Sequence, residues 1–488
     1  MSRAASLGAR VRTVLDTATG DALLFEDRWV SWETLAGQAA SVSRALSDIP
    51  KGAAIAHVAR NRPASVAALL ALLADHRCVV QVSPIQPAAS LAAELLRLAP
   101  AFVIAEAQDW SGEVRAAAET IGAVAIALEG GIAKRICDAG PRSMHPASTG
   151  DGDAAIMMPT SGTTGPPKRV PISFAQLETY RADRDDATPS SRAVIVAAPL
   201  FTVTGLRPLL AWATRPLRMA MMERVDVEQW AALVARYRPR EGGLPPAAMR
   251  MLLESSVPRD SLKSLASWNT GSAPVYPDVA DRFEAEFGLP VLVAYGATEF
   301  GGPVARMTIE DRTLWGSAKR GSSGRAIPGN ELRIVDREDG TACPAGESGL
   351  LEVRAVRTGG DWVRTNDIAH IDGDGFLYIE GRADDVLIRG GFKVALQEVE
   401  ALLETHPAIA QASVLAFPDP RLGEVPVAAI VLRGDAQYLD AQSIDDWARA
   451  RLAPYKLPVR YAFVDTLPTT ASMKINRVEL RRMLGERL

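Results

Sequence analysis

The sequence predicts an α/β protein with a large N-terminal domain of layered sheets and helices, a β-rich subdomain, and a small α+β C-terminal domain. Three observations support this prediction. Between residues 22 and 294, short apolar runs of strand length alternate with helix-length segments, which is typical of parallel sheets flanked by helices. Between residues 332 and 379 the runs are separated by Asp-Gly and Gly-Glu pairs, which indicate β-turns. After residue 384 strands and helices mix over the length of one small domain.

The predicted elements follow one another regularly along the chain. A hairpin at 22–30 precedes a helix that Ser31 can cap, because a serine oxygen accepts from the first free N–H groups of a helix. Strands are expected at residues 53–58, 79–82, 102–105, 123–128, 154–158, 193–197, 265–268, 291–294, 332–335, 349–353, 376–379, 412–417, 425–432 and 461–464. Helices are expected at residues 63–74, 91–98, 173–184, 396–403 and 444–451.

Composition excludes several classes of protein. A net charge of −4 and a pI near 5.9 give no electrostatic reason to expect a nucleic acid or an anionic membrane as partner. The longest apolar run, residues 66–74, is too short to span a bilayer. Three scattered cysteines (Cys78, Cys137 and Cys343) and five unclustered histidines predict a reduced, cytoplasmic protein without a zinc site. The N-terminal arginines lack the apolar core of a secretory signal, so we expect an ordinary first helix.

The segment between Thr160 and Lys168 is the sharpest functional signal. Glycines let a backbone approach a ligand, N–H and hydroxyl groups donate to phosphate oxygens, and lysine adds a positive charge. Two prolines separate Gly165 from Lys168, so the spacing differs from the nucleotide loop G-x-x-x-x-G-K-[ST]. We therefore predict a different phosphate-binding loop. Its residues are Thr160, Ser161, Gly162, Thr163, Thr164, Gly165 and Lys168.

This string, T-S-G-T-T-G-P-P-K, resembles the signature of the AMP-forming ligases, which include acyl- and aryl-CoA synthetases, adenylation domains of peptide synthetases and firefly luciferase. The resemblance covers residues 156–480 through five motifs in the family's order. It implies an enzyme that uses ATP, Mg²⁺ and coenzyme A. It also implies two domains: residues 1–383, which bind ATP and the acid, and a mobile domain of residues 384–488 that turns about a hinge at Asp384.

Two further motifs in the larger domain carry the resemblance, a G-x-A-P turn and a Y-G-x-T-E loop. The matching residues are Gly271, Ser272, Ala273, Tyr295, Gly296, Thr298 and Glu299. The resemblance implies that Tyr295 offers a flat face to adenine, Thr298 a hydroxyl to the α-phosphate, and Glu299 an oxygen ligand to Mg²⁺. Val293 departs from the family, which often has Asn or Gln there for the adenine amino group, so main-chain groups and stacking must hold the base.

The later motifs supply the ribose, coenzyme A and carboxylate contacts. Asp367 and Arg382 match the family's T-G-D and G-R motifs beside the ribose, and a carboxylate is the natural acceptor for two neighbouring hydroxyls. Gly390 and Gly391 would admit the thin pantetheine arm of coenzyme A. Lys474 falls on the family's C-terminal lysine, which is implied to clamp the carboxylate and an α-phosphate oxygen.

Three positions depart from these motifs without removing a charge. Arg169 follows Lys168 where the family has glycine, Asn366 replaces the glycine of T-G-D, and Met473 replaces the glycine before Lys474. We expect Arg169 and Met473 to restrict loop conformations and to lower the rate.

Four residues are expected around the acid: Phe201, Thr202, Gly301 and Gly302. The first two follow the strand at 193–197, and ligands of α/β sheets bind beyond the carboxyl ends of strands. Thr202 stands where the family usually has a histidine, so the shape of the pocket is open, and a core position for Phe201 is as good an interpretation as substrate contact. The glycine pair would leave room at the pocket floor. The sequence thus favours an apolar aryl, alicyclic or medium-chain acid.

The resemblance implies a carboxylic acid–CoA ligase that forms an acyl-AMP and pyrophosphate before the thioester. The catalytic residues would be Lys168, Glu299 and Lys474. A carrier-protein thiol, an amine or, as in luciferase, oxidation of the substrate are alternative fates of the adenylate. A nucleotide-binding relative without activity is a further alternative, against which stands the presence of every charged residue that the chemistry needs.

Overall fold

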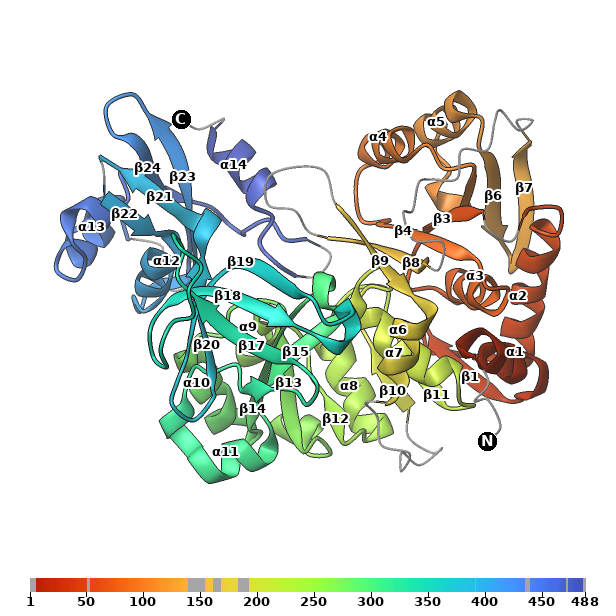
Figure 1. The fold of residues 1–488 in the computed structure, drawn as a ribbon, viewed down its shortest axis with the longest axis horizontal. Helices are drawn as coiled ribbons and strands as arrows, with labels where there is room; N and C mark the ends of the chain where they lie inside the picture. The colour runs from red at the N-terminus through yellow and green to blue at the C-terminus, as the bar shows by residue number, and fades with distance from the viewer. Residues whose placement is uncertain are drawn as a thin grey trace.

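The computed structural model describes residues 6–50, 53–138, 154–160, 168–182, 193–390, 392–434, 439–470 and 473–485. Within these residues the chain forms a large N-terminal domain built on four sheets and a small C-terminal domain built on one (Figure 1). This arrangement confirms the predicted α/β architecture. The described helices include none with the length and apolar content needed to cross a membrane.

A sheet of seven strands forms one side of the large domain, at the right of Figure 1. Its order is β7 (Ile132–Asp138), β6 (Val124–Glu129), β5 (Phe102–Glu106), β3 (Ala54–Val58), β4 (Cys78–Val82), β8 (Ala154–Pro159) and β9 (Arg169–Ser173). The five inner strands are parallel, as the alternation of strands and helices predicted, whereas β7 and β9 pair antiparallel at the two edges.

Helices cover both faces of this sheet because neighbouring strand residues point to opposite sides. Ile55 packs with the helices α1 (Leu7–Thr17), α2 (Trp32–Ala45) and α3 (Pro63–Ala74). Ala56 packs with α4 (Ala88–Leu98) and α5 (Gly112–Ile121) on the other face. Residues 65–74 of α3 are all buried, since an apolar helix without a polar face must lie inside the core.

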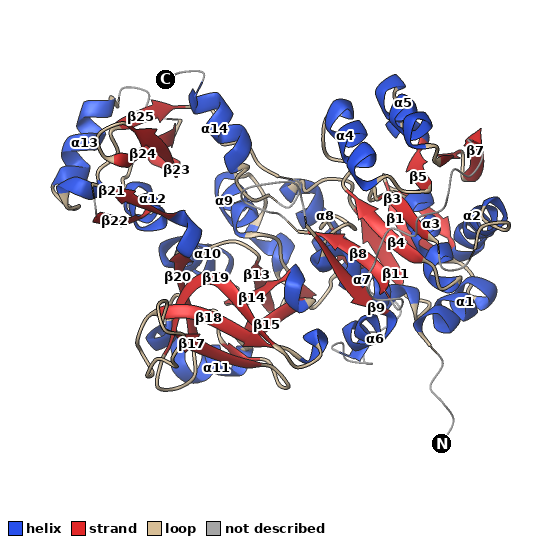
Figure 2. Ribbon diagram, turned by 45° about the horizontal axis from the view of Figure 1, so that its top comes forward, coloured by secondary structure: helices blue, strands red, loops and turns tan. Residues whose placement is uncertain are grey.

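Two smaller sheets complete the α/β part of the large domain. The first has the order β10 (Ala193–Val196), β11 (Arg218–Met221), β1 (Asp21–Phe25) and β2 (Arg28–Ser31). The second has the order β12 (Glu241–Gly242), β13 (Ser267–Gly271), β14 (Val291–Ala297), β15 (Gly302–Arg306) and β16 (Arg325–Ala326). Further helices in the large domain are α6 (Phe174–Ala182), α7 (Val203–Ala213), α8 (Val227–Tyr237), α9 (Pro246–Glu254), α10 (Pro277–Phe287) and α11 (Ile309–Trp315) (Figure 2).

The β-rich region that the Asp-Gly pairs predicted is a four-stranded antiparallel sheet. It comprises β17 (Glu331–Val335), β18 (Gly349–Arg354), β19 (Trp362–Ile371) and β20 (Leu377–Arg382). The sequence did not predict β19, because its half-buried, largely polar residues lack the apolar alternation that marks a strand. Asp367 therefore lies on a strand, opposite Arg382.

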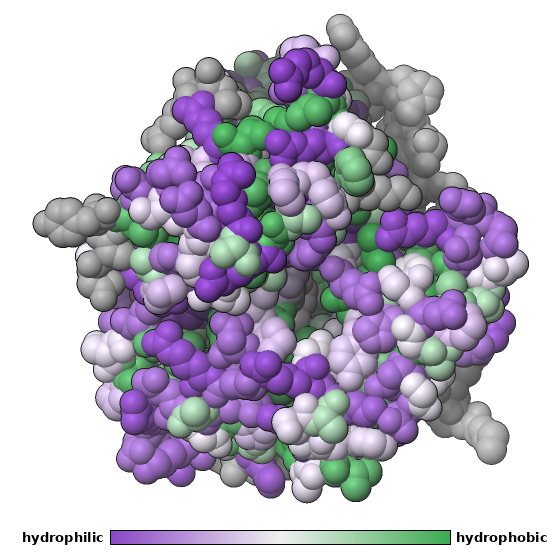
Figure 3. All heavy atoms as spheres, turned by 90° about the vertical axis from the view of Figure 1, so that its left-hand side faces the viewer, coloured by the Kyte–Doolittle hydropathy of each residue, from purple (hydrophilic) through white to green (hydrophobic). Residues whose placement is uncertain are grey.

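The C-terminal domain places helices beside a five-stranded sheet. Its strands are β21 (Val386–Arg389), β22 (Phe392–Ala395), β23 (Ile409–Asp419), β24 (Gly423–Leu432) and β25 (Arg460–Phe463), and its helices are α12 (Leu396–Glu404), α13 (Ala441–Arg449) and α14 (Arg477–Gly485). The face of the molecule that carries this domain is mostly hydrophilic and is hollowed near its centre (Figure 3).

Candidate active site

Asp367 is the centre of the predicted ribose site. The hydroxyl of Tyr295, on β14, donates a hydrogen bond to its Oδ2 atom, and the Nη1 atom of Arg382 lies 3.8 Å from its Oδ1 atom. Burial and the neighbouring carboxylate raise the pKa of Tyr295, so the phenol keeps its proton and remains a donor. The carboxylate retains lone pairs for further donors, which suits the two hydroxyls of a ribose. Sequence reasoning gave Tyr295 a stacking role and missed this orienting hydrogen bond.

Lys474 comes from the other domain and reaches the same place. Burial lowers its pKa, as does the charge of Arg382, whereas the charges of Glu299 and Asp367 act in the opposite direction. The structure thus brings together four predicted site residues that are separated by up to 175 positions, from 299 to 474. A bound polyanion would add negative charge here and would favour the charged ammonium group.

The loop that carries Lys474 is held by its own backbone. The N–H of Thr470 donates to the carbonyl of Lys474 at 2.7 Å, and the N–H of Met473 donates to the carbonyl of Thr470 at 2.9 Å. Met473 has a φ of +59°, the left-handed region that favours glycine, so the backbone keeps the shape expected for the family's glycine. Its side chain packs against a core cluster of the large domain that includes Trp268 and Leu244.

Glu299 lies at the end of β14, in the short 3₁₀ helix η3 (Thr298–Phe300). The side chain of Phe300 is buried and anchors this turn, whereas Glu299 is exposed. Clusters of three or more His, Cys, Asp or Glu residues suited to a metal ion are absent among the described residues. A single carboxylate nevertheless suits Mg²⁺ that arrives with a nucleotide, because this ion takes one or two protein carboxylates and fills its shell with phosphate oxygens and water.

The described ends of the predicted phosphate loop are tied together. The N–H of Thr160 donates to the carbonyl of Lys168 at 2.9 Å, where β8 pairs with β9, and the Lys168 side chain is exposed. Ser161, Gly162, Thr163, Thr164 and Gly165 lie outside the described residues, as does Gly391. Arg169 points away from the loop into the fold, where its guanidinium pairs with Glu94 and donates to the carbonyl of Gln81. This departure therefore serves to fix β9 to the sheet.

The remaining nucleotide residues lie on adjacent strands. Gly271 ends β13 and pairs with Ala294 of β14, so the turn with Ser272 and Ala273 follows beside Tyr295. Gly296 pairs with Pro303 of β15. The two motifs, which are 24 positions apart at Gly271 and Tyr295, thus meet at one sheet edge.

The predicted acid residues are held by contacts that the sequence did not reveal. Thr202 caps α7: its Oγ1 atom accepts from the N–H of Gly205 at 3.2 Å and donates to the carbonyl of Pro199 at 2.7 Å. Phe201 is buried in the core of the large domain. Asn61 fixes the turn before them, because its amide donates to the carbonyl of Ala198 and accepts from the N–H of Leu200, at 3.0 and 2.9 Å.

Gly301 and Gly302 lie against side chains from other elements. A Cβ atom at Gly301 would lie 2.7 Å from the Oη atom of Tyr180, and one at Gly302 would lie 3.4 and 3.6 Å from Val203 and Arg207. Tyr180 of α6 and Arg357 thus crowd Gly301, whereas Val203 and Arg207 of α7 lie at ordinary contact distance from a Cβ atom at Gly302, and the roomy pocket floor stays a prediction. The small size of the two glycines admits these side chains.

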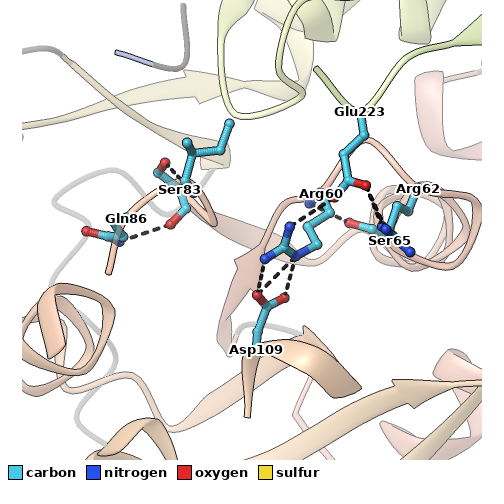
Figure 4. A network of polar contacts seen from close by, with 8 residues as sticks. Arg60, Arg62, Ser65, Ser83, Gln86, Asp109 and Glu223 are labelled. Atoms are coloured by element: carbon cyan, nitrogen blue, oxygen red, sulfur yellow. Dashed lines mark hydrogen bonds and ion pairs between the residues drawn. The ribbon is translucent and has the colours of Figure 1, made fainter. Parts of the chain in front are cut away.

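An ionic network braces the strand ends next to Phe201 (Figure 4). Arg60 binds Asp109 through two nitrogen atoms and contacts Glu223 at 2.9 Å, and Arg62 contacts the other oxygen of Glu223 at 2.7 Å. Because Arg60 follows β3, Asp109 follows β5 and Glu223 follows β11, the network joins the carboxyl ends of two sheets. It stabilises the wall that carries Phe201.

Two family models match the chain. The model described as AMP-binding enzyme matches residues 12–358, and the model described as AMP-binding enzyme C-terminal domain matches residues 398–474. The chain belongs to the AMP-binding enzyme family. The two models fall on the large domain and the C-terminal domain, and the second ends at Lys474.

Curated relatives of this family member include CoA ligases. A 4-coumarate–CoA ligase-like protein of Oryza sativa subsp. japonica is 30% identical over 366 residues, which are 67% of this chain and 60% of the relative. A long-chain-fatty-acid–CoA ligase of Bacillus subtilis is 31% identical over 68% of this chain and 62% of its own length. The chain thus spans about 60% of the length of these relatives in the alignments.

Solved structures share the fold over nearly the whole chain. ATP-bound MatB from Rhodopseudomonas palustris has a TM-score of 0.81 at 23% identity, with 98% of both chains covered. An o-succinylbenzoate CoA synthetase from Bacillus subtilis with its acyl-adenylate has a TM-score of 0.77 at 24% identity, again over 98% of each. An amide bond synthetase from Marinactinospora thermotolerans has a TM-score of 0.78 at 24% identity, over 98% of this chain and 99% of that one.

Proposed function

We propose that this protein is an ATP-dependent carboxylic acid–CoA ligase that forms an acyl-AMP and then an acyl thioester. The observation that carries the proposal is the docking of the Lys474 loop on the large domain, where Met473 packs against a core cluster and the charges of Glu299, Asp367 and Arg382 act on the lysine. A lysine of the C-terminal domain that lies near the carboxylate proposed to bind the ribose can contact a nucleotide and an organic acid at the same time. The CoA ligase relatives support the same reaction class.

In the first step a carboxylate oxygen attacks the α-phosphorus of ATP, and the bond between that phosphorus and the bridging oxygen breaks to release pyrophosphate. Both reactants are anions, so the site must neutralise their repulsion and align them. Lys474 would contact the carboxylate and an α-phosphate oxygen, while Lys168 and the phosphate loop would hold the β- and γ-phosphates. Glu299 would hold Mg²⁺, which would supply positive charge at the triphosphate. Asp367 would hold the ribose, with Tyr295 fixing its orientation.

In the second step the sulfur of coenzyme A attacks the carbonyl carbon, the bond to the phosphate oxygen breaks, and AMP leaves while the thiol loses its proton. Lys474 has no role in this step, so we propose that residues 384–488 turn away from residues 1–383 about Asp384. Gly390 and Gly391 would then line the approach of the pantetheine arm. Asp384→Pro should block thioester formation while adenylation persists, and equal loss of both steps would contradict the hinge.

The proposal also includes the class of the acid and the acceptor of the acyl group. We propose an apolar aryl, alicyclic or medium-chain acid, the class that the sequence favours, although Phe201 itself lies in the core of the large domain. Because an amide bond synthetase shares the fold, an amine or a carrier-protein thiol is the alternative acceptor. Comparing coenzyme A, a phosphopantetheinylated carrier protein and a simple amine as acceptors distinguishes them.

The decisive test is exchange of labelled pyrophosphate into ATP across a panel of carboxylic acids. Wild type should show acid-dependent exchange, and Lys474→Ala should lower it on the order of 100- to 1,000-fold, since a lost transition-state contact of this kind costs about 3–4 kcal/mol. Lys263→Ala is the matched control, because this exposed lysine pairs with Asp260 and is not one of the predicted site residues. Exchange that survives in Lys474→Ala would overturn the role of the lysine.

A further inference from the structure

An ion pair joins the large domain to the C-terminal domain. The Nη1 and Nη2 atoms of Arg250, on α9, lie 3.0 and 2.5 Å from the two carboxylate oxygens of Glu404, the last residue of α12. The two side chains are only 19% and 11% exposed. A two-bonded arginine–carboxylate contact shielded from water has a defined geometry and is much stronger than an exposed pair.

Each partner is fixed within its own domain. The guanidinium carbon of Arg250 lies 5.2 Å from the centre of the Tyr276 ring, and Tyr276 follows Ala273 of the G-x-A-P turn by three residues. The Oε1 atom of Glu404 also accepts from the N–H of Ala412, at the start of β23, at 3.2 Å. The pair can therefore form only when the two domains lie as they do in this structure.

Further contacts connect α12 to the loop of Lys474. Glu400, one helical turn before Glu404, lies 3.4 Å from Arg477, and Arg477 lies 2.5 Å from Asp385. Arg477 follows Lys474 by three residues and begins α14. The orientation of α12 against the large domain thus determines where the lysine loop stands.

We infer that Arg250 and Glu404 are positioning residues whose ion pair holds the C-terminal domain in the orientation that places Lys474 at the nucleotide site. That the ion pair holds this orientation does not depend on the proposed function. Only the assignment of the orientation to the adenylation step rests on the proposed function. Turning the C-terminal domain separates Arg250 from Glu404. The strength of their ion pair therefore sets the fraction of molecules in which Lys474 lies at the nucleotide site. Loss of the pair disfavours adenylation and leaves the transfer step, which needs the other orientation, intact.

The first test measures the orientation without any substrate. The nucleotide-free protein is treated with a water-soluble N-hydroxysuccinimide ester that acetylates lysines. The acetylation rate of Lys474 is measured by mass spectrometry. Lys263 serves as the internal reference because it is exposed. Arg250→Leu and Glu404→Gln should raise the relative rate for Lys474 about fivefold or more. The exchanged pair Arg250→Glu with Glu404→Arg should return it to within about twofold of wild type. An unchanged rate in both single variants would overturn the inference.

Arg259→Leu is the matched control, since Arg259 pairs with Glu286 inside the large domain and is 68% exposed. It should leave the labelling of Lys474 unchanged. If single variants do not fold, the exchanged pair still decides: a folded double variant with wild-type protection supports the ion pair, and one with Lys474 as reactive as Lys263 contradicts it.

The second test separates the two half-reactions. With the acid that gives the strongest exchange in wild type, Arg250→Leu should lower pyrophosphate exchange about 10-fold, while single-turnover transfer from the purified acyl-AMP to coenzyme A stays within about twofold. Equal loss in both would indicate a general structural role and would overturn the inference. If no acid supports exchange, the proposed function fails, but the labelling result still decides the role of the ion pair.

Discussion

The nucleotide end and the acid end of the candidate site are built in different ways. At the nucleotide end, polar side chains from β14, β19, β20 and the C-terminal loop interact with one another around Asp367. At the acid end, Gly301 and Gly302 lie under Tyr180 and Arg207, and the hydroxyl of Thr202 is engaged in capping α7.

On the proposed function, this difference follows from the ligand that each end binds. ATP is the same molecule for every acid, so its contacts can be made by residue types in fixed motifs, and those motifs match this sequence. The acid end takes its shape from side chains that arrive from other elements, and no local pattern describes them. The nucleotide end can therefore be tested residue by residue, whereas the acid end has to be tested through pairs of residues.

The largest effect is expected at the centre of the nucleotide end. Asp367→Asn removes the charge of the side chain that we propose as the acceptor of the ribose hydroxyls, and loss of a hydrogen bond to a charged group costs up to about 3 kcal/mol, on the order of 100-fold in kcat/KM for ATP. The measurement compares ATP with 2′-deoxy-ATP in pyrophosphate exchange. Wild type should discriminate strongly against the deoxynucleotide, and the variant should not.

Tyr295→Phe is the companion variant for this prediction. It removes the donor that orients Asp367 but leaves the carboxylate, so it should keep the discrimination against 2′-deoxy-ATP while lowering kcat/KM several-fold. An Asp367→Asn protein that still prefers ATP as strongly as wild type would show that Asp367 does not hold the ribose.

A smaller effect is expected at the acid end, on stability. Gly301 has a φ of +68°, and a Cβ atom there would approach the Tyr180 hydroxyl to 2.7 Å, so Gly301→Ala should lower the free energy of unfolding by about 2 kcal/mol. The hydroxyl is buried and has no hydrogen-bond partner among the described residues. Tyr180→Phe alone should therefore be neutral or stabilise by up to about 1 kcal/mol.

The double variant distinguishes contact from backbone strain. In the Tyr180→Phe background the obstructing oxygen is gone, so Gly301→Ala should cost less, about 1 kcal/mol for its positive φ together with a shift of the flexible Arg357 side chain, whose Cδ atom would lie 3.2 Å from the new Cβ atom. Chemical denaturation of the four proteins gives the coupling between the two sites. An equal cost of Gly301→Ala in both backgrounds would mean that the hydroxyl is not the obstacle.

The fold could be predicted as far as local patterns reach. Apolar runs separated by helices predicted the parallel core, and Asp-Gly pairs predicted the antiparallel sheet. They did not reveal β19, because a strand whose residues are polar and half-buried shows no apolar alternation. The antiparallel edge strands β7 and β9 were also missed, because charged residues and a proline interrupt their apolar runs.

The residues of the candidate site likewise fall into those that the sequence predicted and those that it did not. Asp367, Arg382 and Lys474 occupy motif positions, so the sequence could predict them as site residues. The structure brings them together. Asn61 could not be named, because its function lies in a hydrogen bond to Leu200, 139 residues later. Tyr180 was likewise missed, since only the packing of α6 over Gly301 gives it a place at the site.

The smallest effect concerns Met473, the one departure from the motifs that touches the lysine loop. A non-glycine residue in the left-handed region costs about 1–2 kcal/mol, and the packing of its side chain on the large domain offsets part of this cost. Met473→Ala keeps the strain and loses the packing, so pyrophosphate exchange should fall about fivefold. Met473→Gly loses both, so its exchange should stay within about twofold of wild type. If alanine matched methionine, the side chain would contribute nothing to the docking of Lys474. If glycine exceeded methionine severalfold, strain would outweigh packing, and the substitution would then act to slow adenylation.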